Sequence, residues 1–165
     1  MFNAMRPFGH RDSGIIGAVL VDDRITAELI CDGIHVEPPA IRLLVKSKGR
    51  ERIVLVSDSL SGAGMPDGNY RLGNFTVHVA GGVSRTVEGN LAGSTLTLDA
   101  AVRNLARFTG LSYRDCLPCA TSNPARVLGL EDQKGVLAPG ADADLAVLDR
   151  SYCVTQTYVR GKPVL

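Results

Sequence analysis

A strand–helix–strand pattern between residues 25 and 59 constrains the fold of this chain more than any other feature. Residues 25–36 (ITAELICDGIHV) and 52–59 (RIVLVSDS) are apolar runs of strand length, and each ends in polar residues. Between them, residues 38–49 (PPAIRLLVKSKG) have prolines suited to a first helical turn, several apolar residues and a final glycine. This order predicts a βαβ unit, in which the two strands are parallel and the crossover is right-handed.

The segments on either side of this unit are less regular. Residues 15–21 (IIGAVLV) form an apolar run that fits either a helix or an extended segment. Residues 69–90 alternate in polarity and are broken at Gly81-Gly82, which predicts an inserted β-hairpin.

The second half of the chain returns to helical periodicity before a strand-rich tail. Residues 94–110 predict a helix with Ser94 or Thr95 as its cap and a glycine at its end. Residues 112–130 predict one or two further helices, and residues 158–165 (YVRGKPVL) predict a terminal hairpin.

Two predicted parallel strands are too few for a complete parallel α/β fold. Such sheets are normally covered by helices on both faces, and a complete (β/α)₈ barrel needs roughly 250 residues. The chain has 165 residues. From the pattern alone, we therefore expect an α/β fold of which part is missing.

Composition excludes several functional classes. The net charge is +1, so the chain lacks the basic excess typical of nucleic-acid binding. No run approaches the roughly 18 apolar residues that span a bilayer. The first residues lack the basic-then-apolar order of a signal peptide. We expect a cytoplasmic protein with neither a nucleic-acid nor a membrane partner.

Four cysteines, Cys31, Cys116, Cys119 and Cys153, are scattered along the chain. Disulfides are not expected in a cytosolic protein. The CLPC pair has the CxxC spacing of redox-active or metal-binding thiols, but no second CxxC accompanies it. A structural role for this pair is therefore the favoured interpretation.

Polar residues gather where the predicted strands end. In parallel α/β folds, reactive groups cluster at the carboxyl ends of strands, and here Asp32 and His35 end the first strand and Asp58 the second. Residues 2–12 form a further polar cluster, and residues 89–97 form a Gly/Ser turn whose N–H groups could meet an anion. Taken singly, a strand-terminal aspartate is as often a turn residue, and a lone histidine can be a hydrogen-bonded core residue.

In sequence order, these segments resemble the N-acetylglucosamine-6-phosphate deacetylase family of the amidohydrolase superfamily. The resemblance covers essentially the whole chain, through FNAM followed by Arg11, DGIHV, LVSDSLSGAG, LAGSTLTL, ATSNPARVLGL and KGVLAPGADADLAVLD. The last of these marks only the superfamily. The NAM…R, DGIHV and LAGSTLT segments are more specific to the deacetylase.

The resemblance implies a fold and a biological setting. Residues 1–130 would be the last strands and helices of a TIM barrel with an inserted hairpin. Residues 131–165 would be the carboxyl-terminal strands of a small β-sandwich domain. A cytoplasmic homodimer acting in amino-sugar metabolism is implied for the full-length family.

The implied reaction is hydrolysis of a linear amide C–N bond, which converts N-acetylglucosamine 6-phosphate to glucosamine 6-phosphate and acetate. A divalent metal, zinc or similar, would polarise the amide carbonyl and acidify water, whose pKa at zinc can fall to about 7. Asp58 matches the aspartate that takes a proton from this water and passes it to the leaving amine, as general base and then general acid.

The resemblance also implies a set of substrate-binding residues. Arg11 suits a phosphate by its charge and fork geometry, and His35 matches a histidine that contacts the substrate. The full set is Asn3, Ala4, Arg11, Asp32, Gly33, Ile34, His35, Leu91, Ala92 and Gly93.

The chain departs from the family at the metal site. The family's ligands, one glutamate and two histidines, fall before the position that matches Met1, and neither His10 nor His78 matches a ligand. We therefore expect a carboxyl-terminal fragment that is inactive alone. The alternative is a non-catalytic or vestigial module that binds sugar phosphates. The DGIHV and NAM…R segments argue against a third possibility, a deacetylase of another acylated sugar or amino acid.

Overall fold

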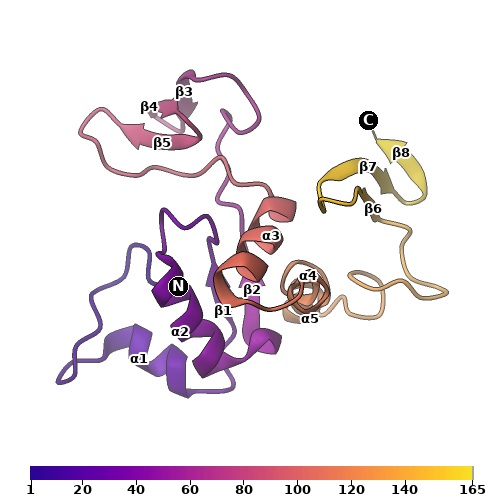
Figure 1. The fold of residues 1–165 in the computed structure, drawn as a ribbon, viewed down its shortest axis with the longest axis horizontal. Helices are drawn as coiled ribbons and strands as arrows, with labels where there is room; N and C mark the ends of the chain where they lie inside the picture. Colours follow the sequence, from indigo (N-terminus) through magenta and orange to yellow (C-terminus); the bar gives the residue numbers. More distant parts are fainter. Residues whose placement is uncertain (165) are drawn as a thin grey trace.

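The computed structural model describes residues 1–164, which adopt the predicted mixed α/β fold (Figure 1). The elements in chain order are α1 (Gly14–Val21), β1 (Ala27–Leu29), α2 (Pro38–Lys48), η1 (Arg50–Arg52), β2 (Ile53–Leu55), β3 (Gly68–Leu72), β4 (Phe75–Ala80), β5 (Val83–Thr86), α3 (Leu98–Thr109), α4 (Tyr113–Cys116), η2 (Leu117–Ala120), α5 (Ser122–Val127), β6 (Leu145–Leu148), β7 (Val154–Val159) and β8 (Lys162–Val164). Within these residues the strands form three separate sheets, β1–β2, β3–β5 and β6–β8.

The β1–α2–β2 unit confirms the predicted strand–helix–strand pattern. The two strands pair in parallel, with Ala27 opposite Ile53, and α2 ends at Lys48 with Gly49 as its C-cap. Both strands are shorter than predicted. After β1 the chain turns, because the Asp32 carboxylate accepts the N–H groups of Ile34 and His35 and so replaces ladder bonds.

The main core lies between this small sheet and the helices α2 and α3. Its members Leu29, Ile41, Leu44, Ile53 and Leu105 are each fully buried. Burying a side chain of this size contributes about 1.5–3 kcal/mol, so these positions hold the βαβ unit and the helices together. α1 resolves the ambiguity of residues 15–21 in favour of a helix.

Three of the four cysteines lie in the same core. Cys31, Cys116 and Cys119 are fully buried, and no pair of them is bonded as a disulfide. Burial raises the pKa of these thiols to about 12, about 11 and about 12 respectively. They are therefore neutral packing groups at physiological pH, which fits the structural interpretation of the CxxC pair.

The insert between β2 and α3 is larger than the predicted hairpin. Gly81 and Gly82 do form the turn between β4 and β5, but β3 adds a third antiparallel strand on the other side of β4. This sheet has its own small core of Leu60, Val77 and Val79. In Figure 1 it stands beyond the amino-terminal end of α3, apart from β6–β8.

The helix α3 starts later than predicted and ends where predicted. Thr97 occupies its N-cap position, and neither Ser94 nor Thr95 caps it, because both hydroxyls bond other segments. Gly110 ends the helix in the left-handed conformation, with φ of +78°. α4, η2 and α5 account for the further helices predicted over residues 112–130.

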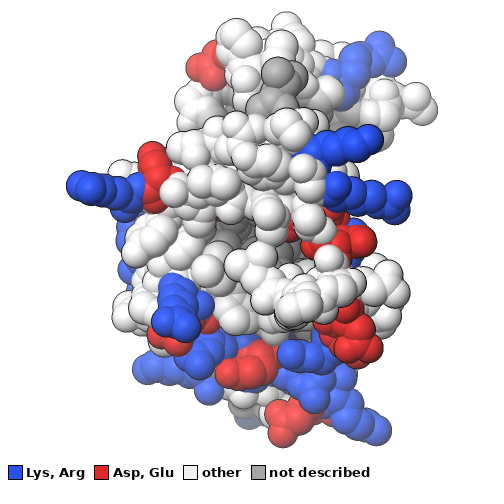
Figure 2. All heavy atoms as spheres, turned by 90° about the vertical axis from the view of Figure 1, so that its right-hand side faces the viewer, with Lys and Arg blue, Asp and Glu red and all other residues white. Residues whose placement is uncertain are grey.

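The tail forms the sheet β6–β8, and β7–β8 is the predicted terminal hairpin, although Leu165 lies outside the described residues. Exposed apolar side chains cover much of it and the segment before it: Val136, Leu137, Leu145, Val147, Val154 and Val159. Figure 2 faces this side and shows a broad uncharged surface, with most charged side chains toward its edges and lower end.

A stacked tyrosine pair joins the tail to the helices. The rings of Tyr113 and Tyr152 are 4.0 Å apart at their centroids and nearly parallel, at 5°. Arg103 donates to the Tyr152 carbonyl at 2.6 Å and to Asp99 at 2.7 Å. These contacts fix the turn before β7 against α3 and α4. Across residues 1–164, no helix is long and apolar enough to cross a membrane.

Candidate functional site

A cavity of about 330 Å³ lies where β1 and β2 end. Its lining residues are Met1, Asn3, Glu28, Ile30, Val56 and Asp58. Two of the predicted site residues, Asn3 and Asp58, are thus brought together here from segments far apart in the sequence. This location agrees with the general placement of reactive groups at the carboxyl ends of parallel strands.

Asp58 follows β2 in an unusual backbone conformation. Its φ is +51°, in the left-handed region that costs most L residues about 1–2 kcal/mol and that aspartate tolerates better than most. The backbone N–H of Ser94 donates to the Asp58 carbonyl at 2.7 Å. The residue is exposed, and its side chain remains available at the cavity. Such strain at a strand end is a common property of functional residues, although a plain turn can share it.

Asp32 and His35 form a second, buried polar group. The Asp32 Oδ2 atom lies 2.6 Å from His35 Nδ1, and the two side chains are 9% and 4% exposed. The other oxygen, Oδ1, accepts the backbone N–H groups of Ile34 at 2.8 Å and His35 at 2.9 Å. Because an ionised carboxylate only accepts, Nδ1 is the donor in this contact.

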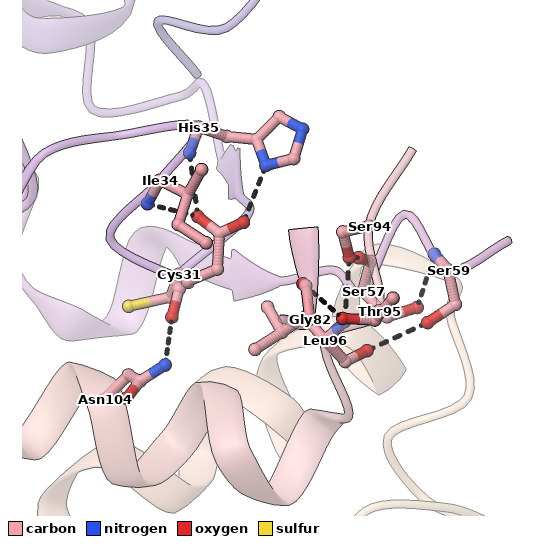
Figure 3. Close-up of polar contacts among 11 residues, drawn as sticks. Cys31, Ile34, His35, Ser57, Ser59, Gly82, Ser94, Thr95, Leu96 and Asn104 are labelled. Atoms are coloured by element: carbon pink, nitrogen blue, oxygen red, sulfur yellow. Dashed lines mark hydrogen bonds and ion pairs between the residues drawn. The ribbon is translucent and has the colours of Figure 1, made fainter. Parts of the chain in front are cut away.

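The loop that carries Asp32 and His35 packs against α3, as Figure 3 shows. Asn104 donates to the Cys31 carbonyl at 2.9 Å. Gly33 has φ of +79°, and a Cβ there would lie 2.8 Å from Cζ of Phe108. Gly33 is therefore required by packing and backbone conformation, while Ile34 beside it is 42% exposed.

The predicted segment Leu91–Gly93 lies beside the Asp58 loop. Ala92 donates its N–H to Ser84 of the inserted sheet at 3.2 Å, and Leu91 bridges to Arg85. A Cβ on Gly93 would lie 3.4 Å from the Asp58 carbonyl oxygen. The segment thus connects the inserted sheet to the loop that carries Asp58.

The other predicted residues lie on the amino-terminal loop. Ala4 and Arg11 are exposed, and neither lines the cavity. His10 is exposed as well, and His78 lies on the exposed face of β4, where its Nδ1 is 3.0 Å from Asn69 Oδ1. Neither histidine lines the cavity.

Two residues of this region were not predicted as functional. Glu28 lines the cavity because it points away from the core between the buried residues Ala27 and Leu29. Strand alternation was the signal that could have found it. Ser94 was predicted as a helix cap and as part of the Gly/Ser turn of residues 89–97, and nothing local in the sequence indicates its contact with Asp58.

The described residues do not supply a metal site. Between residues 1 and 164, no three His, Cys, Asp or Glu side chains lie close enough together to hold a metal ion. The acidic side chains at the cavity are Glu28 and Asp58, and the nitrogen His35 Nδ1 is engaged by Asp32. The cavity as described offers a carboxylate for proton transfer and no ligand set for the metal implied by the resemblance.

Comparison with known proteins gives a match along nearly the whole chain. The model of the Amidohydrolase family matches residues 10–164. A putative N-acetylgalactosamine-6-phosphate deacetylase of Escherichia coli K12 is 44% identical over 161 residues, which are 98% of this chain and 96% of that protein. The N-acetylgalactosamine-6-phosphate deacetylase of E. coli O157:H7 is also 44% identical, but the match covers only 42% of its length.

Solved structures agree with the sequence relatives. The N-acetylglucosamine-6-phosphate deacetylase of Thermotoga maritima matches with a TM-score of 0.89 and 42% identity, over 97% of this chain and 44% of that one. A variant of the Mycobacterium smegmatis deacetylase, solved in complex with N-acetyl-D-glucosamine-6-phosphate, matches with a TM-score of 0.90 and 40% identity, over 99% and 44%. The chain therefore spans less than half the length of most of these relatives.

Proposed function

Because this chain belongs to the amidohydrolase family, we propose that it is the carboxyl-terminal part of a deacetylase that hydrolyses N-acetylglucosamine 6-phosphate to glucosamine 6-phosphate and acetate. The observation that carries the proposal is Asp58, which stands in a strained conformation at the cavity where the parallel strands end. The similarity to deacetylases along the whole chain supports the same conclusion.

The proposed architecture follows the family. Residues 1–130 form the last part of a (β/α)₈ barrel, with β3–β5 as the insert, and residues 131–165 belong to a small β-sandwich domain. The parallel pairing of β1 with β2 and the separate antiparallel sheet β6–β8 support this division. A cytoplasmic homodimer remains the prediction for the longer protein.

In the proposed reaction, the Asp58 carboxylate acts as general base and then as general acid. It takes a proton from the water that attacks the amide carbonyl, so that a C–O bond forms. It then delivers the proton to the nitrogen as the C–N bond breaks, which releases acetate and the free amine. The exposure of Asp58 at the cavity supports this role, since substrate can reach it.

The other site residues hold the substrate in this proposal. In this proposal His35 directs Nε2 toward the substrate of the longer protein, although its side chain is only 4% exposed in residues 1–164 and does not line the cavity. Asp32 contacts Nδ1 and orients the ring rather than binding sugar itself. Arg11 pairs with the 6-phosphate, for which its guanidinium fork is suited. Asn3, at the cavity, contributes a polar amide.

The metal that the family uses would be held by residues from the part of the longer relatives that this chain does not match. When bound, the metal would supply polarisation of the amide carbonyl and a more acidic water. Residues 1–165 alone are therefore proposed to lack turnover.

A specific observation favours a second substrate. The two E. coli relatives that are 44% identical carry the name of the N-acetylgalactosamine 6-phosphate reaction. The two sugars differ only in the orientation of one hydroxyl group, and the same Asp58 chemistry would serve both.

A chimeric enzyme tests the proposed function. In it, this chain replaces the matched 42% of the E. coli O157:H7 deacetylase, which supplies the remainder. We expect acetate release from one or both sugar phosphates. A chimera that folds and binds the sugar phosphate without turnover would instead support the vestigial binding module.

A further inference from the structure

Ser94 is a buried polar residue that holds the loop around Asp58. It is 3% exposed, and each of its polar atoms has a partner. Its backbone N–H donates to the Asp58 carbonyl at 2.7 Å, and its carbonyl accepts the Leu60 N–H at 3.0 Å. Its hydroxyl donates to the Ser57 carbonyl and accepts the Leu96 N–H at 3.0 Å. The partners of Ser94 therefore include both sides of Asp58 as well as Asp58 itself.

Further contacts join the same two segments, residues 57–60 and residues 93–96, and we call this set of hydrogen bonds the brace. Residues 93–96 lie alongside residues 57–60, with a parallel bridge between Ser59 and Ser94. The Ser59 hydroxyl donates to the Leu96 carbonyl at 2.8 Å. Figure 3 shows the bonds of Ser94 to Ser57 and Leu96 and the bond of Ser59 to Leu96. Two short stretches far apart in the sequence are thus fixed in one register at the end of β2.

The brace has a clear physical task, since Asp58 adopts a conformation that an aspartate does not favour by itself. A φ of +51° is less favourable than a negative φ even for aspartate, which tolerates this region better than most residues, and the surrounding contacts hold it here. A free loop would relax toward negative φ and rotate the carboxylate away from its present direction. The bonds from Ser94 are made to the backbone of this turn and leave the Asp58 side chain available to the cavity.

We propose that Ser94 is the positioning residue for Asp58: its hydrogen bonds hold the left-handed turn that presents the carboxylate to the cavity. The importance of this position for the reaction rests on the proposed function, but the positioning itself does not. Ser94 touches neither substrate nor reacting atoms in this proposal and acts through the Asp58 backbone.

The chain offers a matched control in Ser84. This serine is 2% exposed, and its hydroxyl has no hydrogen-bond partner among the described residues. Ser84→Ala and Ser94→Ala remove the same atom from equally buried sites. Only Ser94→Ala breaks hydrogen bonds of the Asp58 loop, so a difference between the two variants isolates the brace.

The test uses the whole chain labelled with ¹⁵N and ¹³C, without substrate or metal. Ser94→Ala removes the hydroxyl bonds to the Ser57 carbonyl and the Leu96 N–H, so the backbone bonds at residues 60 and 94 must hold the loop alone. For this variant we expect amide exchange at residues 60, 94 and 96 to accelerate about tenfold or more. The Asp58 Cα and Cβ shifts should lose their positive-φ signature. The Val56 amide, bonded to Leu29 in the core sheet, should not change. Ser94→Thr keeps a hydroxyl and should restore both signals.

Unchanged Asp58 shifts and unchanged exchange in Ser94→Ala would overturn the proposal, and so would an equal effect of Ser84→Ala. If Ser94→Ala does not fold, the proposal is tested by amide exchange and Asp58 chemical shifts in the unmodified chain. Protected amides at residues 60 and 94 with positive-φ shifts at Asp58 support the brace, and exchange as fast as in an open loop contradicts it. None of these measurements depends on deacetylation, so a failure of the proposed reaction can be distinguished from a failure of this proposal.

Discussion

The Asp32 carboxylate and the His35 ring are joined by a 2.6 Å contact between Oδ2 and Nδ1, and both side chains are nearly excluded from solvent. Asp32 also binds two backbone N–H groups of its own turn, so its oxygens are occupied within the loop. On this ground we propose that Asp32, which the resemblance assigns to substrate binding, sets the tautomer and direction of His35.

Asp32→Asn should therefore change the tautomer of His35. The amide of asparagine can donate as well as accept, so it no longer requires the proton on Nδ1. We expect ¹⁵N imidazole spectra at pH 8 to show Nδ1–H in the unmodified chain and a mixture of tautomers in the variant. An unchanged single tautomer would contradict the proposed role, and the exposed His10 provides an internal reference in the same spectra.

Gly33→Ala should destabilise the chain more than its backbone conformation alone explains. Gly33 and Gly110 have nearly equal φ, +79° and +78°, but only Gly33 lacks room for a Cβ, because Phe108 would lie 2.8 Å away. Gly110→Ala should cost about 1–2 kcal/mol for the left-handed conformation. Gly33→Ala should add about 1–3 kcal/mol for the steric conflict. Urea unfolding of both variants measures the difference. Equal losses of unfolding free energy would show that the Phe108 ring moves aside without cost.

Tyr152→Ala should loosen the tail from the helices. Its ring stacks on Tyr113, and such pairs contribute about 0.5–1.5 kcal/mol beyond the area that they bury. We expect faster proteolytic cleavage between residues 130 and 154, while Tyr152→Phe, which keeps the ring, should resemble the unmodified chain. Equal cleavage of all three proteins would exclude the stack as the attachment.

Asp99 should contribute to stability in a defined pH range. Burial alone would raise its pKa, but hydrogen bonds from Thr97, Arg103 and the Ala100 backbone outweigh burial and lower the pKa to about 2. A carboxyl with a lowered folded pKa stabilises the fold above its unfolded value, near 3.9, and this contribution is lost as the pH falls toward 2.

Replacing Asp99 by Asn should consequently flatten the loss of stability between pH 4 and pH 2. The effect should not exceed about 1 kcal/mol, since the pair with Arg103 is partly solvated. Asp12→Asn removes the carboxylate of an exposed ion pair with Arg6 and serves as the control. Denaturant titrations across this pH range measure the free energy of unfolding of both variants. If that free energy falls with pH in Asp99→Asn as it does in the unmodified chain, Asp99 does not contribute to the acid sensitivity.

The sequence predicted those features that depend on local pattern. The βαβ unit followed from two apolar runs around a proline-led helix, and the parallel pairing of Ala27 with Ile53 confirms it. Asp58 could be singled out because it stands at the end of the apolar run that predicted the second strand. The third strand of the insert was missed, since β3 is half exposed and its apolar residues Tyr70 and Leu72 pack only on the small core around Val77.

The brace around Asp58 could not be predicted from local pattern. Ser94 precedes a helix and has the residue type of a cap, so propensity alone assigns it there. Its actual partners, Ser57, Asp58 and Leu60, are more than thirty positions away, with the insert between them in the chain. Such long-range register depends on tertiary packing that a single sequence does not display.

The most direct test of the central claim is acetate release by the chimera described above with Asp58 replaced by Asn. If Asp58 is the general base and acid, turnover should fall about 10²–10⁴-fold while KM changes little, because the amide keeps the shape and loses the proton transfer. The exposed Asp132→Asn should leave turnover unchanged. Near-normal turnover of Asp58→Asn in a folded chimera would contradict the account.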